Sequence, residues 1–474
     1  MDVALRALNR FGLGARRGER QRISDPRSWL KAQLDGGAPS LHSNDIPPPG
    51  AIGDAVRRLR LPGQRDEQER REARRRLVEL SAAEARTALE ARISSNRPFV
   101  ERLVAFWSNH LCVSAGSKIL VAPFAGAYER DVIRPHVLGR FEDMVLASAK
   151  HPAMLAYLDN FQSIGPSSPG ASAGQRNNGA KRGLNENYAR ELLELHTLGV
   201  NGGYTQTDVQ ELARILTGWT IEGIGGPGAR VPQGAQPRRA GGVIRRARPE
   251  PGSAIGFTFR EMLHEPGTKT VLDERYEEDG LAEGEHVIRA LCRHPSTARF
   301  VATKLATHFI SDDPPAAAVD RLARAFRSSE GDLKVVARTL IDEPEAWRDD
   351  ARKFRAPQDW FVAVMRAFGA NNEVNPNAPV VLRQLRQPLW SPPSPKGFGD
   401  AMQEWADPDS LLNRGELART ISRQPAVAAL DPRTLLDVVD VATGNPLHSL
   451  IADTSIPAPE RVALAIAGPA FQWR

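Results

Sequence analysis

The sequence has 474 residues, of which 63 are Lys or Arg and 57 are Asp or Glu, giving a formal net charge of +6. Hydrophobic residues make up 41% and charged residues 25%, fractions that are ordinary for a folded globular protein and exclude wholesale disorder. No stretch approaches the roughly 18 uninterrupted apolar residues of a membrane-spanning helix, so we expect no such helix.

The sequence contains no recognisable targeting signal. The first ten residues carry an acid at position 2 and no apolar core, so they do not predict a secretory signal. Arg16 and Arg17 form a twin-arginine pair, but a polar segment follows them, so we do not interpret the pair as an export signal. We therefore expect a cytoplasmic location by default, with the envelope reached through a partner. Cys112 and Cys292 can form at most one disulfide and cannot supply a cysteine zinc site, which leaves the compartment open.

Helical periodicity dominates the first third of the chain. The predicted helices cover residues 4–14, 28–34, about 64–94, 98–111, 121–149 and 152–160. In the long charged helix, arginines alternate with acids over residues 65–72. This pattern is typical of a solvated helix surface with local ion pairs, each contributing about 0.2–0.5 kcal/mol.

Two Gly-rich loops, 165–183 and 223–256, interrupt the middle of the chain and are expected to be its most mobile internal segments. After them, residues 256–259 and 268–272 predict a strand pair around a turn at 265–267. The remainder, from about 281 to 472, is predicted to be helical with proline breaks.

These elements predict a mostly α-helical fold with more than half of the residues in helices. We interpret the chain as one large helical domain, 1–474, that carries the two loops and one small β-hairpin. An N-terminal half, 1–164, and a C-terminal helical half, 281–474, are the alternative division.

Residues 184–199 form the most informative helix. Asn185 is the predicted N-cap and Gly199 the stop. At 100° per residue the apolar side chains, Val200 included, sweep one arc that contains His196, so this imidazole should be buried. The opposite arc consists of Asn187, Arg190, Glu191 and Glu194.

The polar arc has two interpretations. It is an exposed face on which Arg190 pairs with Glu186 and Glu194, or it is a polar cluster that lines a cleft and serves acid–base chemistry or a hard cation. A tight turn and a capping box from Thr205 to Asp208 then start the next helix, predicted over 209–218 and ended by Trp219.

The block 185–200, together with 202–206 and 216–220, closely resembles the bacterial domain-of-unknown-function family 1800. Similar matches run along nearly the whole chain: 8–16, 106–110, 151–155, 158–160, His264 with Gly267 and Lys269, 294–298, and 471–474. The resemblance implies a mostly helical fold and no assigned reaction. Ser108 stands where many relatives carry a histidine, which weakens any metal site drawn through that position.

The resemblance also suggests a partner. Members are often encoded beside a second uncharacterised family, domain-of-unknown-function 1501, whose proteins look like exported sulfatase-like or phosphatase-like proteins. This association indicates a pair that works at the cell envelope or on an extracellular polymer.

Five of the ten histidines lie in the family-like motifs. His151 and His294 precede prolines, where a ring nitrogen often caps a helix start. The sequence lacks a His-Glu-x-x-His motif, a Gly-x-Ser-x-Gly motif, a Walker loop and a dinucleotide fingerprint, which disfavours the corresponding enzyme classes.

As site hypotheses, the catalytic candidates are Glu191, Glu194, His110 and His264, and the substrate-binding candidates are Asn187, Arg190, Asp159, Trp219 and Lys269. The sequence identifies neither a metal nor a cofactor.

Three classes of function remain. The first is a helical assembly or accessory partner of an envelope or extracellular-polymer system. The alternative is an enzyme that acts on a polar polymer such as a polysaccharide, for which a carboxylate pair is the typical requirement. Nucleic-acid binding is a weak alternative, because its only support is the basic segment 238–248, whose location among glycines and prolines favours a disordered insert.

Overall fold

The computed structural model describes residues 2–41, 43, 45–60, 67–176, 183–222, 252–369 and 377–474. The basic segment 238–248 lies outside these residues, as does most of the predicted loop 223–256. Helices make up 62% of the structure, which confirms the mostly α-helical prediction.

The N-terminal helices occur close to their predicted positions, except for the helix over 49–60, which was not predicted. They are α1 (Val3–Arg6), the π-helical η1 (Ala7–Phe11), α2 (Pro26–Leu34), α3 (Pro49–Arg60), α4 (Glu67–Ser94) and α5 (Pro98–His110). The start of α2 follows from its sequence, because the Asp25 side chain accepts hydrogen bonds from the Arg27 and Ser28 amides and Pro26 needs no donor partner.

The prediction of one continuous helix over 121–149 is wrong. The structure contains η3 (Ala122–Phe124), α6 (Ala125–Tyr128), the π-helical η4 (Glu129–Ile133), α7 (Arg134–His136) and, after a turn, α8 (Phe141–Lys150). Pro135 has no amide hydrogen to donate, and Gly139 lies in the turn that separates α7 from α8.

The middle of the chain departs further from prediction. After α9 (Pro152–Tyr157), residues 169–176 form α10 (Pro169–Arg176), so the segment 165–183 is not wholly a loop. Then come α11 (Asn187–Glu191), the π-helical η6 (Leu192–Thr197) and α12 (Gln206–Ile215). The capping box at Thr205 and Asp208 is confirmed, whereas Trp219 begins a strand rather than ending a helix.

The predicted strand pair is wrong in its partners. Strand β2 (Phe257–Phe259) pairs antiparallel with β1 (Trp219–Ile221), and β3 (Lys269–Val271) pairs with β4 (Glu274–Tyr276). The described residues therefore contain two small sheets instead of one hairpin. A two-residue turn with positive φ at Leu272 and Asp273 closes the β3–β4 hairpin.

The C-terminal third is helical, as predicted, and most of its helices begin at or next to a proline. Its helices are α13 (Leu281–Arg293), α14 (Pro295–Phe309), α15 (Ala316–Ser328), α16 (Leu333–Asp342), α17 (Pro357–Phe368), α18 (Ala378–Gln384), α19 (Pro408–Ser422), α20 (Pro425–Ala428), α21 (Pro446–Ala452) and α22 (Ala458–Ala467).

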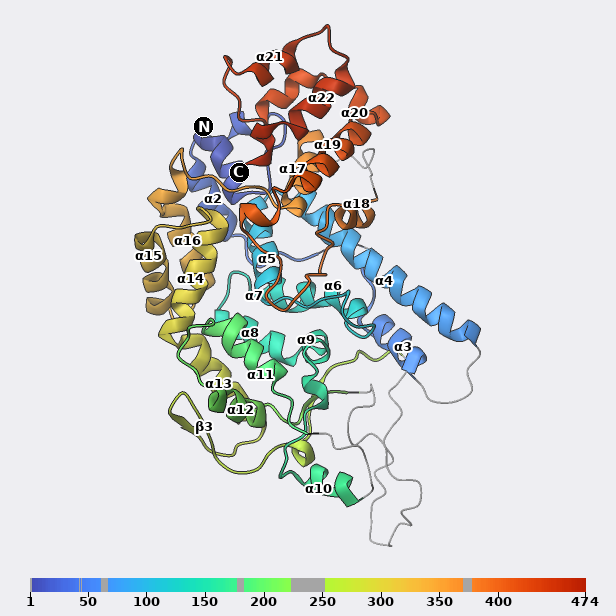
Figure 1. The fold of residues 1–474 in the computed structure, drawn as a ribbon, viewed down its shortest axis with the longest axis vertical. Coiled ribbons are helices and arrows are strands. Elements are labelled where there is room, and N and C mark those ends of the chain that lie inside the picture. The colour runs from blue at the N-terminus through green and yellow to red at the C-terminus, as the bar shows by residue number, and fades with distance from the viewer. Residues whose placement is uncertain are drawn as a thin grey trace.

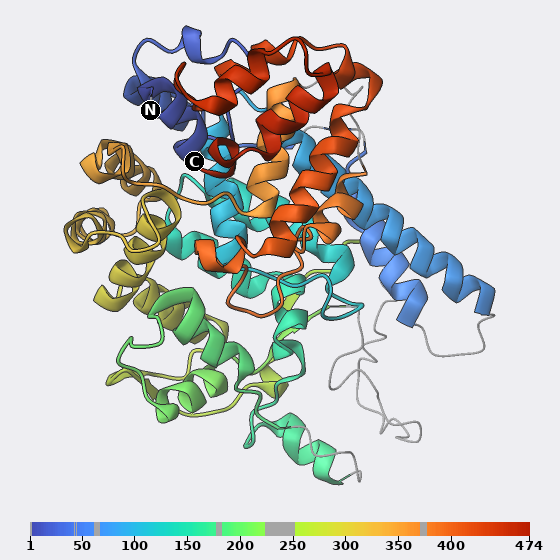
Figure 2. The same cartoon turned by 45° about the horizontal axis from the view of Figure 1, so that its top comes forward.

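Two hydrophobic cores hold these helices. The larger core contains buried side chains from residue 7 to residue 346, and the second joins residues 4–23 to helices α17–α22. The N-terminal helices therefore pack beside the C-terminal helices at one end of the molecule, while α8, α11 and α12 lie towards the other end (Figures 1 and 2).

The first and last family-like motifs contact each other. An Arg10 guanidinium nitrogen donates to the Arg474 carbonyl at 3.2 Å, and Arg474 donates back to the Arg10 carbonyl at 3.4 Å. Gly14, at φ +110°, packs so closely on α17 that a Cβ there would lie 2.7 Å from the Ala363 Cβ. These motifs serve the packing of the chain.

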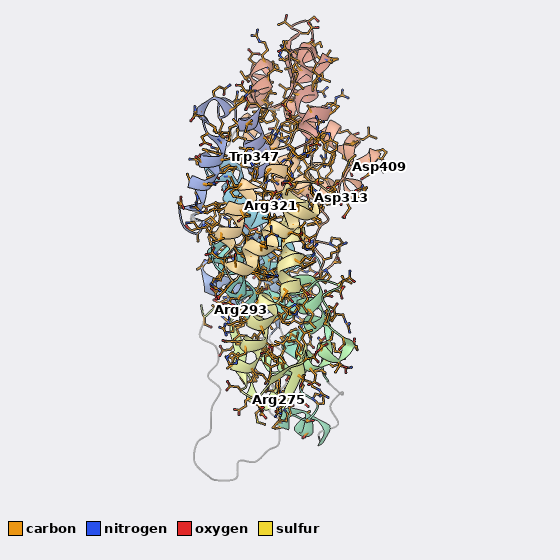
Figure 3. The ribbon with its side chains drawn as sticks, turned by 90° about the vertical axis from the view of Figure 1, so that its left-hand side faces the viewer. Arg275, Arg293, Asp313, Arg321, Trp347 and Asp409 are labelled. Atoms are coloured by element: carbon orange, nitrogen blue, oxygen red, sulfur yellow. The ribbon has the colours of Figure 1, made fainter. Side chains whose placement is uncertain are left out.

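Helices α13–α16 form a layer along one side of the body, which faces the viewer in Figure 3. Arg293, near the lower part of this face, forms an ion pair with Glu142 of α8, with an N–O distance of 2.7 Å. Trp347, near the upper part, stacks on Phe11 with ring centroids 5.0 Å apart. Buried side chains of α13–α16 also belong to the larger core, so the layer packs against the body in addition to making these two contacts.

Candidate functional site

Helix α11 begins one residue later than predicted. Glu186 occupies the N-cap position without a side-chain cap, and the Asn185 side chain accepts a 2.9 Å hydrogen bond from the Asn187 amide. The side-chain amides of Asn185 and Asn187 both donate to the Leu158 carbonyl at 3.4 Å. Asn187 therefore anchors the helix start to the end of α9.

The π-helical continuation η6 changes which side chains face the core. The Leu198 amide donates to the Leu193 carbonyl at 2.8 Å, a bond of π-helical spacing, so side chains after Leu192 no longer advance by 100° per residue. His196 is buried as predicted, but Val200, placed in the same apolar arc, is 65% exposed. π-Helical segments are frequent at functional sites.

The polar face divides into a paired part and an unpaired part. Arg190 forms an ion pair with Glu186 at 3.3 Å and donates to the Gln206 side chain at 2.8 Å, as an ordinary exposed face would. Glu194 accepts a 3.2 Å hydrogen bond from the Tyr204 hydroxyl.

Glu191 is half-buried, and no hydrogen bond or ion pair to its carboxylate occurs within the part of the chain that the structure describes. Burial and the nearby negative charge of Glu194 raise its pKa, against the opposing effect of Arg190. Burial also raises the pKa of the Tyr157 hydroxyl, with further contributions from Cys112 and Glu191. Tyr157 therefore lies within electrostatic range of the Glu191 carboxylate.

His110 and His196 lie in the core behind this helix. His110 Nε2 is 3.1 Å from the His196 carbonyl, while His110 Nδ1 and His196 Nε2 are buried and have no hydrogen-bond partner among the described residues. Burial lowers the pKa of His110 well below its ordinary value and that of His196 to about 3, and the positive charge of Lys304 adds to both shifts. Both rings therefore stay neutral at physiological pH.

His264 and Lys269 belong to a separate buried cluster. His264 Nε2 lies 3.1 Å from Glu283 Oε2, and Lys269 Nζ donates to the same oxygen at 3.1 Å and to the Glu265 carbonyl at 2.6 Å. His264 Nδ1 lies 3.0 Å from the Thr217 carbonyl. These contacts join the strand region to the start of α13.

Trp219 is fully buried beside this cluster, where a Cβ at Gly284 would clash with its indole at 2.5 Å. Asp159 lies elsewhere, in a left-handed turn with φ +60°, and forms a 2.7 Å ion pair with Lys118. The nine candidate residues therefore occur in separate groups. The described contacts do not join His110, Asp159 or His264 to the carboxylates of Glu191 and Glu194.

The sequence did not suggest several buried polar residues. The buried Glu283 and Tyr157 and the half-buried Tyr204 were not among the candidates. Glu283 lies three residues after Gly280, in the first turn of α13. Ser108 also has a role that we did not predict, because its hydroxyl donates to the buried Glu129 carboxylate at 3.2 Å.

The remaining histidine predictions are confirmed. His151 caps α9 by accepting from the Ala153 amide at 3.1 Å, and His294 caps α14 by accepting from the Ser296 amide at 3.2 Å. Cys112 and Cys292 are both free and buried. Among the described residues, no group of three or more His, Cys, Asp or Glu side chains has the arrangement of a metal site.

The fold and these sites define a mostly helical protein whose polar clusters are largely buried. No helix in the described segments combines the length and the apolar character that a membrane crossing requires. The family described as "Protein of unknown function (DUF1800)" matches residues 6–473, so the chain belongs to that family. Comparisons with curated proteins and with solved structures gave no match.

Proposed function

We propose that Glu191 is the acid of an acid–base site that acts on a polar polymer such as a polysaccharide. The supporting observation is a half-buried carboxyl group of raised pKa that has no partner among the described residues. A raised pKa keeps more of this carboxyl group protonated at a given pH than an ordinary glutamic acid, which is the direction that a general acid requires. Glu194, three residues later, is the second carboxylate.

The chemistry would be the hydrolysis of a glycosidic bond. Glu191 gives its proton to the leaving oxygen as the bond from that oxygen to the anomeric carbon breaks. The oxygen of a water molecule bonds to the anomeric carbon, and the proton of that water passes to Glu194. The hydrogen bond from Tyr204 fixes the Glu194 carboxylate for this task. Arg190, exposed on the same face, would contact the polymer.

Replacing Glu191 with glutamine should reduce the release of reducing ends from carboxymethylcellulose, polygalacturonate or dextran by about 10²–10⁴-fold, the usual contribution of a general acid. The control is Glu211→Gln on α12, which removes a partly buried carboxylate paired with Arg214 at 2.8 Å and should leave hydrolysis unchanged.

A second readout needs no substrate. Carbodiimides react with protonated carboxyl groups, so at pH 6 Glu191 should be labelled faster than Glu211, as followed by peptide mass spectrometry. Equal labelling of the two residues, or full hydrolysis by the Glu191→Gln protein, would contradict the proposal.

A second candidate function, an assembly or accessory partner of an envelope or extracellular-polymer system, is favoured by one feature. Helices α3 and α4 lie side by side and project from the body (Figures 1 and 2). The described part of the outer half of α4 buries only Ala73, Leu77 and Leu80, and exposes Val78 by 69%. A projecting arm of this kind presents a surface to a partner.

The arm can be tested by co-expression with a neighbour-encoded protein of family 1501. We expect the two proteins to co-purify in a fixed ratio, and Val78→Asp to weaken the complex at least tenfold. Val380→Asp, at a valine of α18 that is 51% exposed, is the matched control. Absence of a complex with the unaltered chain, or equal binding by both variants, would exclude the arm as the interface.

A further inference from the structure

A pocket with a volume of about 270 Å³ lies beside α2, and its walls include Arg16, Arg17, Glu19, Arg22 and Trp29. Figure 1 shows α2 in the upper part of the molecule and α11 in the lower part, so this pocket is separate from Glu191. The arginines come from the first family-like motif and the segment after it, which the proposed function does not use.

The pocket carries an excess of positive charge. Within the described segments, Arg16, Arg17 and Arg22 have no acidic side chain within 4.0 Å. Glu19 does not neutralise them, because its carboxylate accepts a 2.8 Å hydrogen bond from the Arg16 amide and lies 3.6 Å from the fully buried Arg366 guanidinium. Three arginine side chains therefore face the pocket, and the carboxylate of Glu19 is directed to Arg366 instead of to them.

Hydrogen bonds hold the guanidinium groups of Arg16 and Arg17 in place. Arg16 donates to the Asn96 side chain at 2.8 Å and to the Ile93 and Ser95 carbonyls at 3.1 and 3.0 Å, while its buried Nε has no hydrogen-bond partner in the described part of the chain. Arg17 donates to the Phe368 carbonyl at 3.0 Å. Groups fixed before binding lose little entropy when a ligand arrives. Arg22 is exposed, and no described contact occupies it.

Trp29 forms a rigid aromatic wall. Its indole is partly buried and packs against both hydrophobic cores, so it cannot swing away from the pocket without disturbing them. Ile23, which is 9% exposed, adds apolar surface. An indole offers a broad apolar face of the kind that packs against the C–H face of a sugar ring.

We propose that this pocket binds an acidic sugar, with the arginines holding its acid group and Trp29 packing against its ring. The exposed Arg22 guanidinium can hold a carboxylate or phosphate group with two parallel hydrogen bonds, while Arg16 and Arg17 add positive charge that is fixed in place. Guanidinium groups remain charged at all physiological pH values. The volume of about 270 Å³ lies just below the range of about 300–1,000 Å³ for small-molecule sites, which suits one sugar unit. The carboxylate of a uronate and the phosphate of a sugar phosphate share this chemistry.

Isothermal titration calorimetry with the full chain tests the pocket with four probes: glucuronate, glucose 6-phosphate, glucose and inorganic phosphate. We expect one of the two acidic sugars to bind at least tenfold more tightly than both glucose and phosphate, and which one it is identifies the acid group. Arg22→Ala should weaken that binding about tenfold or more, and Arg22→Glu should abolish it. Arg74→Ala, which removes an exposed arginine of α4, should have no effect.

If inorganic phosphate and glucose 6-phosphate bind with equal affinity, the sugar ring has no role in binding. If glucose binds as tightly as the acidic sugars, the charge has no role. No binding of either acidic sugar at 10 mM, or unchanged binding by both Arg22 variants, would reject the site. The Glu191→Gln protein should bind the same sugar with unchanged affinity, so the pocket and the proposed function can fail independently.

Discussion

Replacing Glu129 with alanine should lower the free energy of unfolding by about 3–5 kcal/mol, because it leaves the buried Arg92 guanidinium without its counter-charge and the buried Arg134 guanidinium with Glu101 as its remaining carboxylate. The fully buried Glu129 carboxylate accepts from Arg92 at 2.6 Å, from Arg134 at 2.9 Å and from the Trp390 indole at 2.8 Å. Urea denaturation at pH 7 measures the loss. As a control, Glu79→Ala removes an exposed carboxylate of α4 and should cost at most about 1 kcal/mol.

Because of the Glu129 carboxylate, we expect the free energy of unfolding to fall at acidic pH. Arg92 and Arg134 overcome the effect of burial and hold the pKa of Glu129 at about 2, below its ordinary value of 4.5. A carboxyl group whose pKa is depressed by folding stabilises the folded state at pH values above its ordinary pKa. This stabilisation is lost as the pH falls towards the pKa of the folded state, and for Glu129 it amounts to about 3 kcal/mol. Between about pH 4.5 and pH 2 the Glu129→Gln protein should therefore lose less stability than the unaltered protein. Parallel pH profiles of the two proteins would show this account to be wrong.

The predictions that held depend on local sequence. The capping box at Thr205 and Asp208, the histidine caps at His151 and His294, and the proline starts of the C-terminal helices were all readable within three or four residues of the chain. The predictions that failed depend on distant contacts. Strand β2 pairs with β1, and the two strands are separated by the segment that we predicted to be a loop. No local pattern therefore identifies the partner of β2.

In the candidate site, too, local sequence did not reveal contacts between distant residues. A helical wheel found the polar arc and the buried His196, but a wheel assumes a constant angle, and the π-helical η6 breaks that assumption after Glu191. The partners of His264 and Lys269 lie in another element, and Glu283 has no feature in its own neighbourhood that predicts burial. Reading the motifs therefore located important residues without revealing whether they serve packing or chemistry.

Arginine has a structural role that its charge alone would not suggest. Arg102, Arg134, Arg355, Arg366 and Arg474 are among the largest fully buried side chains. Arg102 and Arg474 share the Asp359 carboxylate at 2.8 and 3.2 Å, and Arg366 donates to the Gly14 carbonyl at 2.8 Å. The arginine-rich composition therefore reflects internal bonding as well as a solvated surface.

Replacing Glu283 with alanine should also lower the free energy of unfolding by about 3–5 kcal/mol. Its Oε2 atom accepts from Lys269 and lies within hydrogen-bonding distance of His264, and the carboxylate is 1% exposed. Without it, the buried Lys269 ammonium retains the Glu265 carbonyl at 2.6 Å and His264 Nε2 at 3.4 Å, and neither group is a counter-charge. Urea denaturation at pH 7 measures the effect, and Glu283→Gln, which keeps one acceptor oxygen, should lose less.

Glu285→Ala is the matched control on the same helix, because Glu285 pairs with Lys150 and Arg289 at a 23% exposed position and such pairs contribute at most about 1 kcal/mol. The comparison also decides what the cluster does. A strongly destabilised Glu283→Ala protein means that His264 and Lys269 serve the packing of the strand region on α13. Unchanged or increased stability together with lost hydrolysis would instead assign the cluster to chemistry, since functional groups are often retained at a cost in stability.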